Sequence, residues 1–135
     1  MGDPVYFDTS ALVKLVLNEP ESSEMARFVD GLAGQPVSSE LSELELLRAV
    51  LRQHPDGLDT ALEVLARLVM LPMTESIRLR AAYLAPTSLG SLDAFHLATA
   101  LEIQVDLETI VSYDNRLCEA ARDHAIDTVS PGASD

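Results

Sequence analysis

The sequence predicts an α/β domain of three layers, with a mostly parallel central sheet of about four to five strands flanked by helices. Short apolar runs of β type alternate along the chain with longer stretches whose apolar residues recur at helical spacing. Strands that are separated by helices favour parallel pairing with right-handed crossovers. A length of 135 residues suits one hydrophobic core. We therefore expect one domain over residues 1–130 and a frayed tail over residues 131–135.

In the first half of the chain, Val5-Tyr6-Phe7 forms an apolar run typical of a buried strand. Breaks at Asn18-Glu19-Pro20 and His54-Pro55-Asp56-Gly57 mark where helices stop. Ser22 and Ser23 can cap a helix whose apolar face runs from Met25 to Leu32, and Gly31 and Gly34 close it. The other elements expected up to residue 71 are strands at 5–7, 36–38 and 69–71, and helices at 9–17, 39–53 and 58–68.

In the second half, residues 85–90 form the clearest loop, and Ser91 can cap the helix that follows it. Residues 109–112, Thr-Ile-Val-Ser, are the best strand of the sequence because β-branched residues dominate them. The elements expected after residue 71 are helices at 74–84, 92–103 and 115–124, and strands at 109–112 and 127–129.

The charge balance is strongly acidic, with 22 Asp and Glu against 9 Lys and Arg and a net charge of −13. Such a field repels nucleic acid unless cations intervene. One cysteine, Cys118, can form neither an internal disulfide nor a thiolate zinc site, so a metal would need oxygen or histidine ligands. The sequence contains no apolar run long enough to cross a bilayer and no leader pattern, and we expect a cytoplasmic protein without membrane contact.

Two predicted strands end in the same way, each with an aspartate directly before a helix. Asp8 follows the first strand and Asp114 follows the strand at residues 109–112. If these strands are neighbours, a spacing of about 4.8 Å brings the two carboxylates within reach of one cation. Either aspartate alone is explained as a helix cap, but the pair together favours a site.

For two further acids, the residues alone do not decide between a role at the site and a structural role. Asp93 lies in the first turn of a predicted helix, where the helix dipole also favours an anion, and His96 follows one turn later. In the helix at residues 39–53, four leucines mark an expected buried stripe, and spacing does not decide between Glu43 and Glu45 as an inward-facing acid. The four leucines are Leu41, Leu44, Leu47 and Leu51.

Four segments carry a resemblance to a known family. They are Tyr-Phe-Asp-Thr-Ser-Ala-Leu-Val-Lys-Leu, Val-Ser-Ser-Glu-Leu-Ser-Glu-Leu-Glu-Leu-Leu-Arg-Ala, Ser-Leu-Asp-Ala-Phe-His-Leu-Ala-Thr-Ala-Leu and Val-Ser-Tyr-Asp-Asn-Arg-Leu. In this order the chain resembles PIN-domain ribonucleases, and most closely the VapC-type toxins of bacterial toxin–antitoxin pairs. The likeness covers almost the whole chain, and the motifs are specific together although each is weak alone.

The resemblance implies a three-layer PIN-like fold and an endoribonuclease that needs Mg²⁺ or Mn²⁺. It selects Glu45 and leaves Glu43 as the alternative, because in the family the glutamate precedes Leu-Leu-Arg-Ala. The residues that it assigns are Asp8, Glu45, Asp93 and Asp114 as catalytic and metal-binding acids, with Thr9, Ser10, Ser112 and Arg116 in support.

The resemblance also implies partners: an RNA substrate, a second copy of the chain in a homodimer, and an antitoxin whose basic tail occupies the acidic groove. Four basic residues could hold RNA phosphates near the acids. A catalytically inactive PIN-like scaffold that binds a protein partner is the alternative. Receiver domains and haloacid-dehalogenase-type phosphatases fit less well, because both need a second acid near the first and the chain has Thr9 and Ser10 there. The basic residues are Lys14, Arg48, Arg52 and Arg116.

Overall fold

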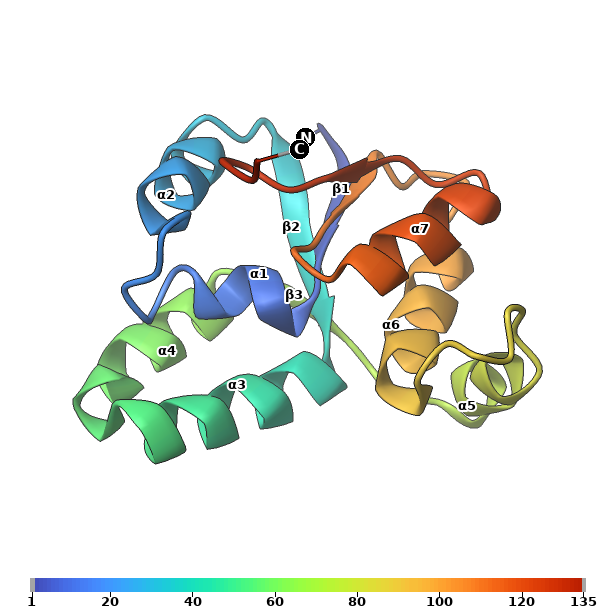
Figure 1. The fold of residues 1–135 in the computed structure, drawn as a ribbon, viewed down its shortest axis with the longest axis horizontal. Coiled ribbons are helices and arrows are strands. Elements are labelled where there is room, and N and C mark those ends of the chain that lie inside the picture. The colour runs from blue at the N-terminus through green and yellow to red at the C-terminus, as the bar shows by residue number, and fades with distance from the viewer. Residues whose placement is uncertain (1, 135) are drawn as a thin grey trace.

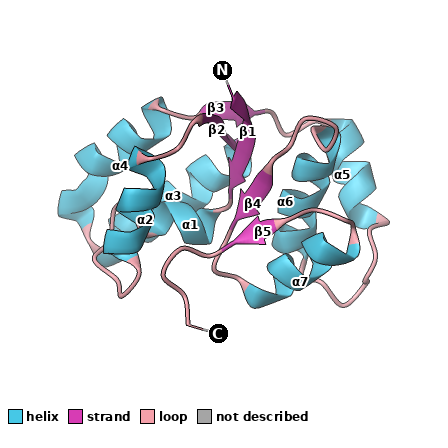
Figure 2. Cartoon of the chain, turned by 90° about the horizontal axis from the view of Figure 1, so that it is seen from above, coloured by secondary structure: helices cyan, strands magenta, loops and turns pink. Residues whose placement is uncertain are grey.

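The computed structural model describes residues 2–134. A parallel five-stranded sheet forms the centre of the domain. Helices cover both of its faces, so that the domain has three layers (Figures 1 and 2). The predicted α/β class is therefore confirmed. Along the chain the elements are β1 Gly2–Phe7, α1 Thr9–Val13, α2 Ser22–Asp30, β2 Gly34–Ser39, α3 Glu40–Gln53, a 3₁₀ turn Pro55–Gly57, α4 Leu58–Ala66, β3 Val69–Leu71, α5 Glu75–Ala82, α6 Ser91–Glu102, β4 Thr109–Val111, α7 Asn115–Asp123 and β5 Thr128–Val129.

The strand order places the first strand at the centre of the sheet. Read across the sheet, the order is β3-β2-β1-β4-β5, so the chain moves outward from β1 to β3 and then returns to the other side of β1. Phe7 of β1 pairs with Val111 of β4 in parallel register. Ligands of such sheets bind outside the carboxyl ends of the strands where the strand order reverses, which here is the β1–β4 boundary.

Alternation along β1 divides the core between the two faces of the sheet. Val5 and Phe7 pack with α1, α2, α3 and α4 on one face, whereas Tyr6 packs with Leu97 of α6 and Leu117 of α7 on the other. A smaller cluster joins Leu41 of α3, Ile77 of α5 and Phe95 of α6. Two packed faces hold β1 and β4 rigidly, and the ends of these strands carry Asp8 and Asp114.

Several local predictions were wrong by a few residues. The first helix ends at Val13 rather than residue 17, because the amides of Lys14 and Leu15 donate to carbonyls three residues earlier and tighten the chain into a turn. The second strand has six residues instead of three, since β1 and β3 pair with it on both sides.

Two capping predictions were also wrong. Ser22 is already helical, and its hydroxyl bonds to the backbone of Leu17 and Glu19 instead of capping α2. Gly90, not Ser91, precedes the first turn of α6.

The leucine stripe predicted for α3 was wrong as well. Leu41 is buried, but Leu44 and Leu51 are 56% and 54% exposed. The inner face of α3 consists instead of Leu41, Ser42, Leu46 and Val50.

Candidate active site

Asp8 is a buried carboxylate at the carboxyl end of the central strand. Only 3% of the residue is exposed, and its Oδ1 accepts hydrogen bonds from Ser10 Oγ at 2.7 Å and the Ala11 amide at 3.0 Å. Its Oδ2 accepts from Ser112 Oγ at 2.6 Å. Burial raises the pKa of Asp8, and His96 and the three hydrogen bonds offset part of this increase. The ionised form of Asp8 is therefore costly in the metal-free protein, and a cation bound beside it would lower that cost.

Asp114 lies beside Asp8 across the β1–β4 boundary and also begins α7. Its Oδ1 accepts from the amides of Arg116 and Leu117, which is the geometry of a helix cap. The hydroxyl of Ser112 connects the two acids, since it accepts from the Asp114 amide at 3.0 Å and donates to Asp8. The cap and the shared site were predicted as alternatives, and the structure is compatible with both roles for the same residue.

Asp93 faces Asp114 from the first turn of α6. Burial and the negative charge of Asp114 raise the pKa of Asp93 to about 6, and the charge of Asp8 adds to this effect. Three aspartates from distant parts of the chain therefore influence one another. Two carboxylates this close repel each other at neutral pH, and a divalent cation would remove that repulsion.

Glu45 points inward from the second turn of α3 and is fixed by two side chains. Its Oε1 accepts from Thr9 Oγ1 at 2.6 Å and lies 2.9 Å from His96 Nε2. Burial alone would raise the pKa of Glu45, but the contacts with His96 and Thr9 outweigh burial and lower it. Glu43 is exposed, so the geometry favours Glu45 over this alternative. The simpler interpretation, an ion pair of Glu45 with Arg48, is not among the ion pairs found over residues 2–134.

Two buried residues connect to Glu45. Sequence reasoning missed the role of Tyr6, whose phenol oxygen lies 2.8 Å from His96 Nδ1. His96, which is 4% exposed, bridges Tyr6 and Glu45, as a buried supporting group would. The spacing of three residues between Asp93 and His96 on one helix was the available signal, because such residues share a face.

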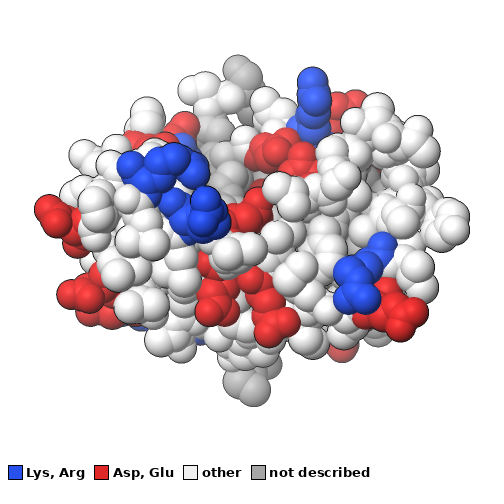
Figure 3. Space-filling model, turned by 90° about the horizontal axis from the view of Figure 1, so that it is seen from below, with Lys and Arg blue, Asp and Glu red and all other residues white. Residues whose placement is uncertain are grey.

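The basic residues are distributed unevenly around the acids. Lys14 forms ion pairs with Glu19 at 3.2 Å and Glu21 at 2.8 Å and is 13% exposed, so it is not available to RNA. Arg48 is exposed on α3 and Arg116 is exposed near the start of α7. Figure 3, viewed from below Figure 1, shows acidic side chains across the middle of this face and basic side chains on either side.

The donor set fits a hard divalent cation. Asp8, Asp93, Asp114 and Glu45 offer oxygen atoms only, which are the ligands of Mg²⁺ and Mn²⁺. Over residues 2–134, no three Asp, Glu, His or Cys side chains stand close enough to form a preformed metal cage. Mg²⁺ does not require one, because it commonly contacts one or two carboxylates and keeps several waters.

Comparison with known proteins decides the family. The PIN domain family model matches residues 5–123. The chain belongs to the PIN domain family. This PIN domain is 40% identical over 133 residues to ribonuclease VapC47 of Mycobacterium tuberculosis, covering 96% of this chain and 98% of the relative. It is 42% identical over 131 residues to ribonuclease VapC35 of the same species, covering 95% and 97%. A toxin–antitoxin complex from Klebsiella pneumoniae has the same fold, with a TM-score of 0.72, 19% identity and coverage of 94% and 97%.

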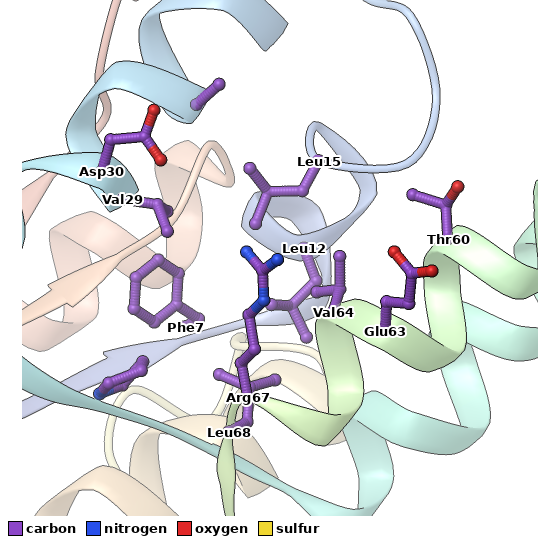
Figure 4. Close-up of a pocket in the computed structure, with 12 residues that line it drawn as sticks. Phe7, Leu12, Leu15, Val29, Asp30, Thr60, Glu63, Val64, Arg67 and Leu68 are labelled. Atoms are coloured by element: carbon purple, nitrogen blue, oxygen red, sulfur yellow. The ribbon is translucent and has the colours of Figure 1, made fainter.

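The PIN domain has a pocket away from the acids, on the face of the sheet that carries α1, α2 and α4. This pocket of about 190 Å³ has mostly apolar walls, including Phe7, Leu12 and Val64 (Figure 4). The side chain of Arg67, the residue that follows α4, lies between those of Asp30 and Glu63 in this view. Within the described part of the chain, no helix is long and apolar enough to span a membrane.

Proposed function

We propose that this protein is a divalent-metal-dependent endoribonuclease that hydrolyses RNA phosphodiester bonds and acts in the cytoplasm as the toxin of a toxin–antitoxin pair. The observation that carries the proposal is the convergence of Asp8, Asp93 and Asp114 at the point where the strand order reverses. Membership of the PIN family and 35% to 42% identity to several VapC ribonucleases support it. The metal requirement follows from the chemistry of the oxygen donors.

In this proposal Asp8 and Asp114 are direct ligands of Mg²⁺ or Mn²⁺, and Asp93 and Glu45 are ligands or hold water at the site. The bound ion would lower the pKa of a water molecule and neutralise charge on the phosphate. Ser10 and Ser112 orient the Asp8 carboxylate, and Thr9 orients Glu45. Because these hydroxyls and the sheet hold the acids in place, little reorganisation is needed when RNA binds.

RNA would be held by a few arginines rather than by a broad basic surface. Arg48 and Arg52 are exposed and lie one turn apart on α3, and Arg116 is exposed beside Asp114 on α7. With a net charge of −13, the chain favours short or locally gripped RNA segments over long contacts.

We infer that the antitoxin makes two contacts. A basic tail would neutralise the acids at the active site, and an apolar segment would fill the pocket lined by Phe7, Leu12 and Val64. The apolar walls of that pocket are the kind of surface that partner proteins cover. The likeness to toxin–antitoxin complexes from Klebsiella pneumoniae and Haemophilus influenzae supports an antitoxin as the partner.

We also propose a homodimer, formed near the place where α3, α5 and α6 pack on one another. Leu41, Ile77 and Phe95 form the buried junction of these helices. The same helices expose large apolar side chains, which a second copy would cover. These are Leu44 and Leu51 on α3, Leu79 on α5 and Leu92 on α6.

The proposal is tested with fluorescent RNA panels in Mg²⁺, Mn²⁺ and EDTA. We expect cleavage with either ion, none with EDTA, and none by Asp8→Asn or Asp114→Asn variants that remain folded. Glu43→Gln is the matched control, because it removes an exposed acid from the helix that carries Glu45, and it should cut normally. Cleavage by Asp8→Asn at the normal rate would refute the site. Absence of cleavage together with an unchanged melting temperature in millimolar Mn²⁺ would instead favour the inactive scaffold.

A further inference from the structure

His96 lies at the junction of three elements that carry the acids. From α6 it reaches Tyr6 of β1, with 2.8 Å between Nδ1 and the phenol oxygen, and Glu45 of α3, with 2.9 Å between Nε2 and Oε1. Both contacts are made by the side chain of His96, which is 4% exposed. Tyr6 is fully buried, so the series of contacts runs from the core to Glu45 at the candidate site.

In the neutral form of the His96 ring, its two contacts set the directions of the hydrogen bonds. A carboxylate only accepts, so Nε2 carries the hydrogen and donates it to Glu45. Nδ1 then accepts from the Tyr6 hydroxyl. Tyr6 and Glu45 therefore both favour the tautomer of His96 with its hydrogen on Nε2.

The same contacts relate Glu45 to the aspartates. Tyr6 lies near the end of β1, and Asp8 follows it by two residues, directly after the strand. His96 follows Asp93 by three residues on α6, so both lie on one face of that helix. A glutamate side chain has several rotatable bonds, so contacts that hold it in one position before metal binds reduce the entropy lost on binding. The contacts from Tyr6 through His96 therefore help to set the position of the Glu45 carboxylate.

We propose that Tyr6 and His96 are positioning residues, which hold the carboxylate of Glu45 toward Asp8 and Asp93 so that the four acids bind the divalent ion as one set. This inference rests on the proposed function and adds to it two residues that act through Glu45. Groups that orient metal ligands in this way typically contribute roughly 10- to 100-fold to metal affinity or activity.

A pair of substitutions at His96 tests the direction of the contact. The amide nitrogen of glutamine stands near the position of Nε2, so His96→Gln keeps a donor to Glu45. Asparagine reaches only the position of Nδ1, so His96→Asn loses it. Thr99→Val is the matched control, since it removes a buried hydroxyl of the same helix that bonds to the Phe95 carbonyl and not to the acids.

Mn²⁺ affinity by calorimetry, RNA cleavage and thermal melting without metal are measured for each variant. We expect His96→Asn to lose roughly 10- to 100-fold in Mn²⁺ affinity. His96→Gln should lose less, because it keeps the donor to Glu45 but not the acceptor for Tyr6, and Thr99→Val should stay near wild type. The double variant Glu45→Gln with His96→Asn should bind Mn²⁺ no more weakly than Glu45→Gln alone, because both changes remove the same interaction. Nitrogen NMR of the metal-free protein should show the Nε2–H tautomer, and Tyr6→Phe should disturb it.

Three results would overturn the inference. One is normal Mn²⁺ affinity in His96→Asn. Another is an equal loss in His96→Gln and His96→Asn that follows the loss of thermal stability, because that result indicates packing alone. The third is additive losses in the double variant. Failure of the proposed function is distinguishable, because wild type would then cleave no RNA in Mg²⁺ or Mn²⁺, whereas failure of this inference leaves wild-type cleavage intact and removes only the difference in Mn²⁺ affinity between His96→Gln and His96→Asn.

Discussion

Replacing Asp93 with asparagine is expected to stabilise the metal-free protein while it abolishes RNA cleavage. Burial and the charge of Asp114 raise the pKa of Asp93 from 3.8 to about 6. One pKa unit corresponds to about 1.4 kcal/mol, so a difference of about two units corresponds to an upper limit of about 3 kcal/mol. Asp93 is partly exposed, and solvent screening reduces the expected gain to about 1–2 kcal/mol.

The gain should depend on pH in a defined direction. The folded protein binds the Asp93 proton more tightly than the unfolded chain does, so stability falls as pH rises from about 4 to about 6 and stays lower above that. Asparagine has no such proton. The advantage of Asp93→Asn should be complete near pH 7.5, smaller near pH 5, and absent below about pH 4.

Urea unfolding in EDTA at these pH values measures the effect, with the exposed Asp106→Asn as the control. Adding Mn²⁺ should stabilise wild type through binding linkage and should stabilise Asp93→Asn much less. If Asp93→Asn is no more stable than wild type near pH 7.5 in EDTA, or if its advantage persists unchanged in acid, the repulsion between Asp93 and Asp114 is not what the structure indicates.

Three further predictions test other parts of the structure. Ser112→Ala removes a donor that lowers the pKa of Asp8, so the acidic limb of the cleavage profile against pH should move to higher pH, and an unmoved limb would contradict this. Val64→Asp puts a charge into the apolar pocket and should weaken antitoxin binding by at least about tenfold in calorimetry, while RNA cleavage continues. If Val64→Asp and wild type bind the antitoxin with equal affinity, the pocket is not the antitoxin site. Leu46→Ala should cost about 2–5 kcal/mol in urea unfolding because Leu46 is fully buried, and a loss well below this range would mean that α3 repacks.

The sequence was informative about the sheet and its ends because strand alternation and parallel crossovers depend on local pattern. The continuous apolar run before Asp8 predicted a buried strand, and the aspartate after residues 109–112 predicted a second acid at the same edge. Parallel strands bring their carboxyl ends to one side, so proximity of the two acids required only that β1 and β4 be neighbours. Whether β1 and β4 are neighbours depends on the strand order, and the spacing of residues along the sequence does not predict that order.

The details of α3 were less accessible. Leucine spacing suggested a buried stripe through Leu44 and Leu51, but the inner face includes Ser42, a polar residue that no periodicity analysis favours. Over residues 2–134, the Ser42 hydroxyl is the buried side-chain oxygen that has no hydrogen-bond partner. The choice between Glu43 and Glu45 likewise depends on Thr9 and His96, which come from other elements. Contacts of this kind are tertiary and leave no local signature.

The position of β1 in the middle of the sheet has a consequence for synthesis. Ser112, which bonds to Asp8, follows it by 104 residues, and β4 must be added before the two meet. A nascent chain therefore carries no assembled site until the segment through Asp114 has left the ribosome. If the proposed function holds, the time needed to translate that distance would delay RNA cleavage, and an antitoxin already present could bind each new copy as its site forms.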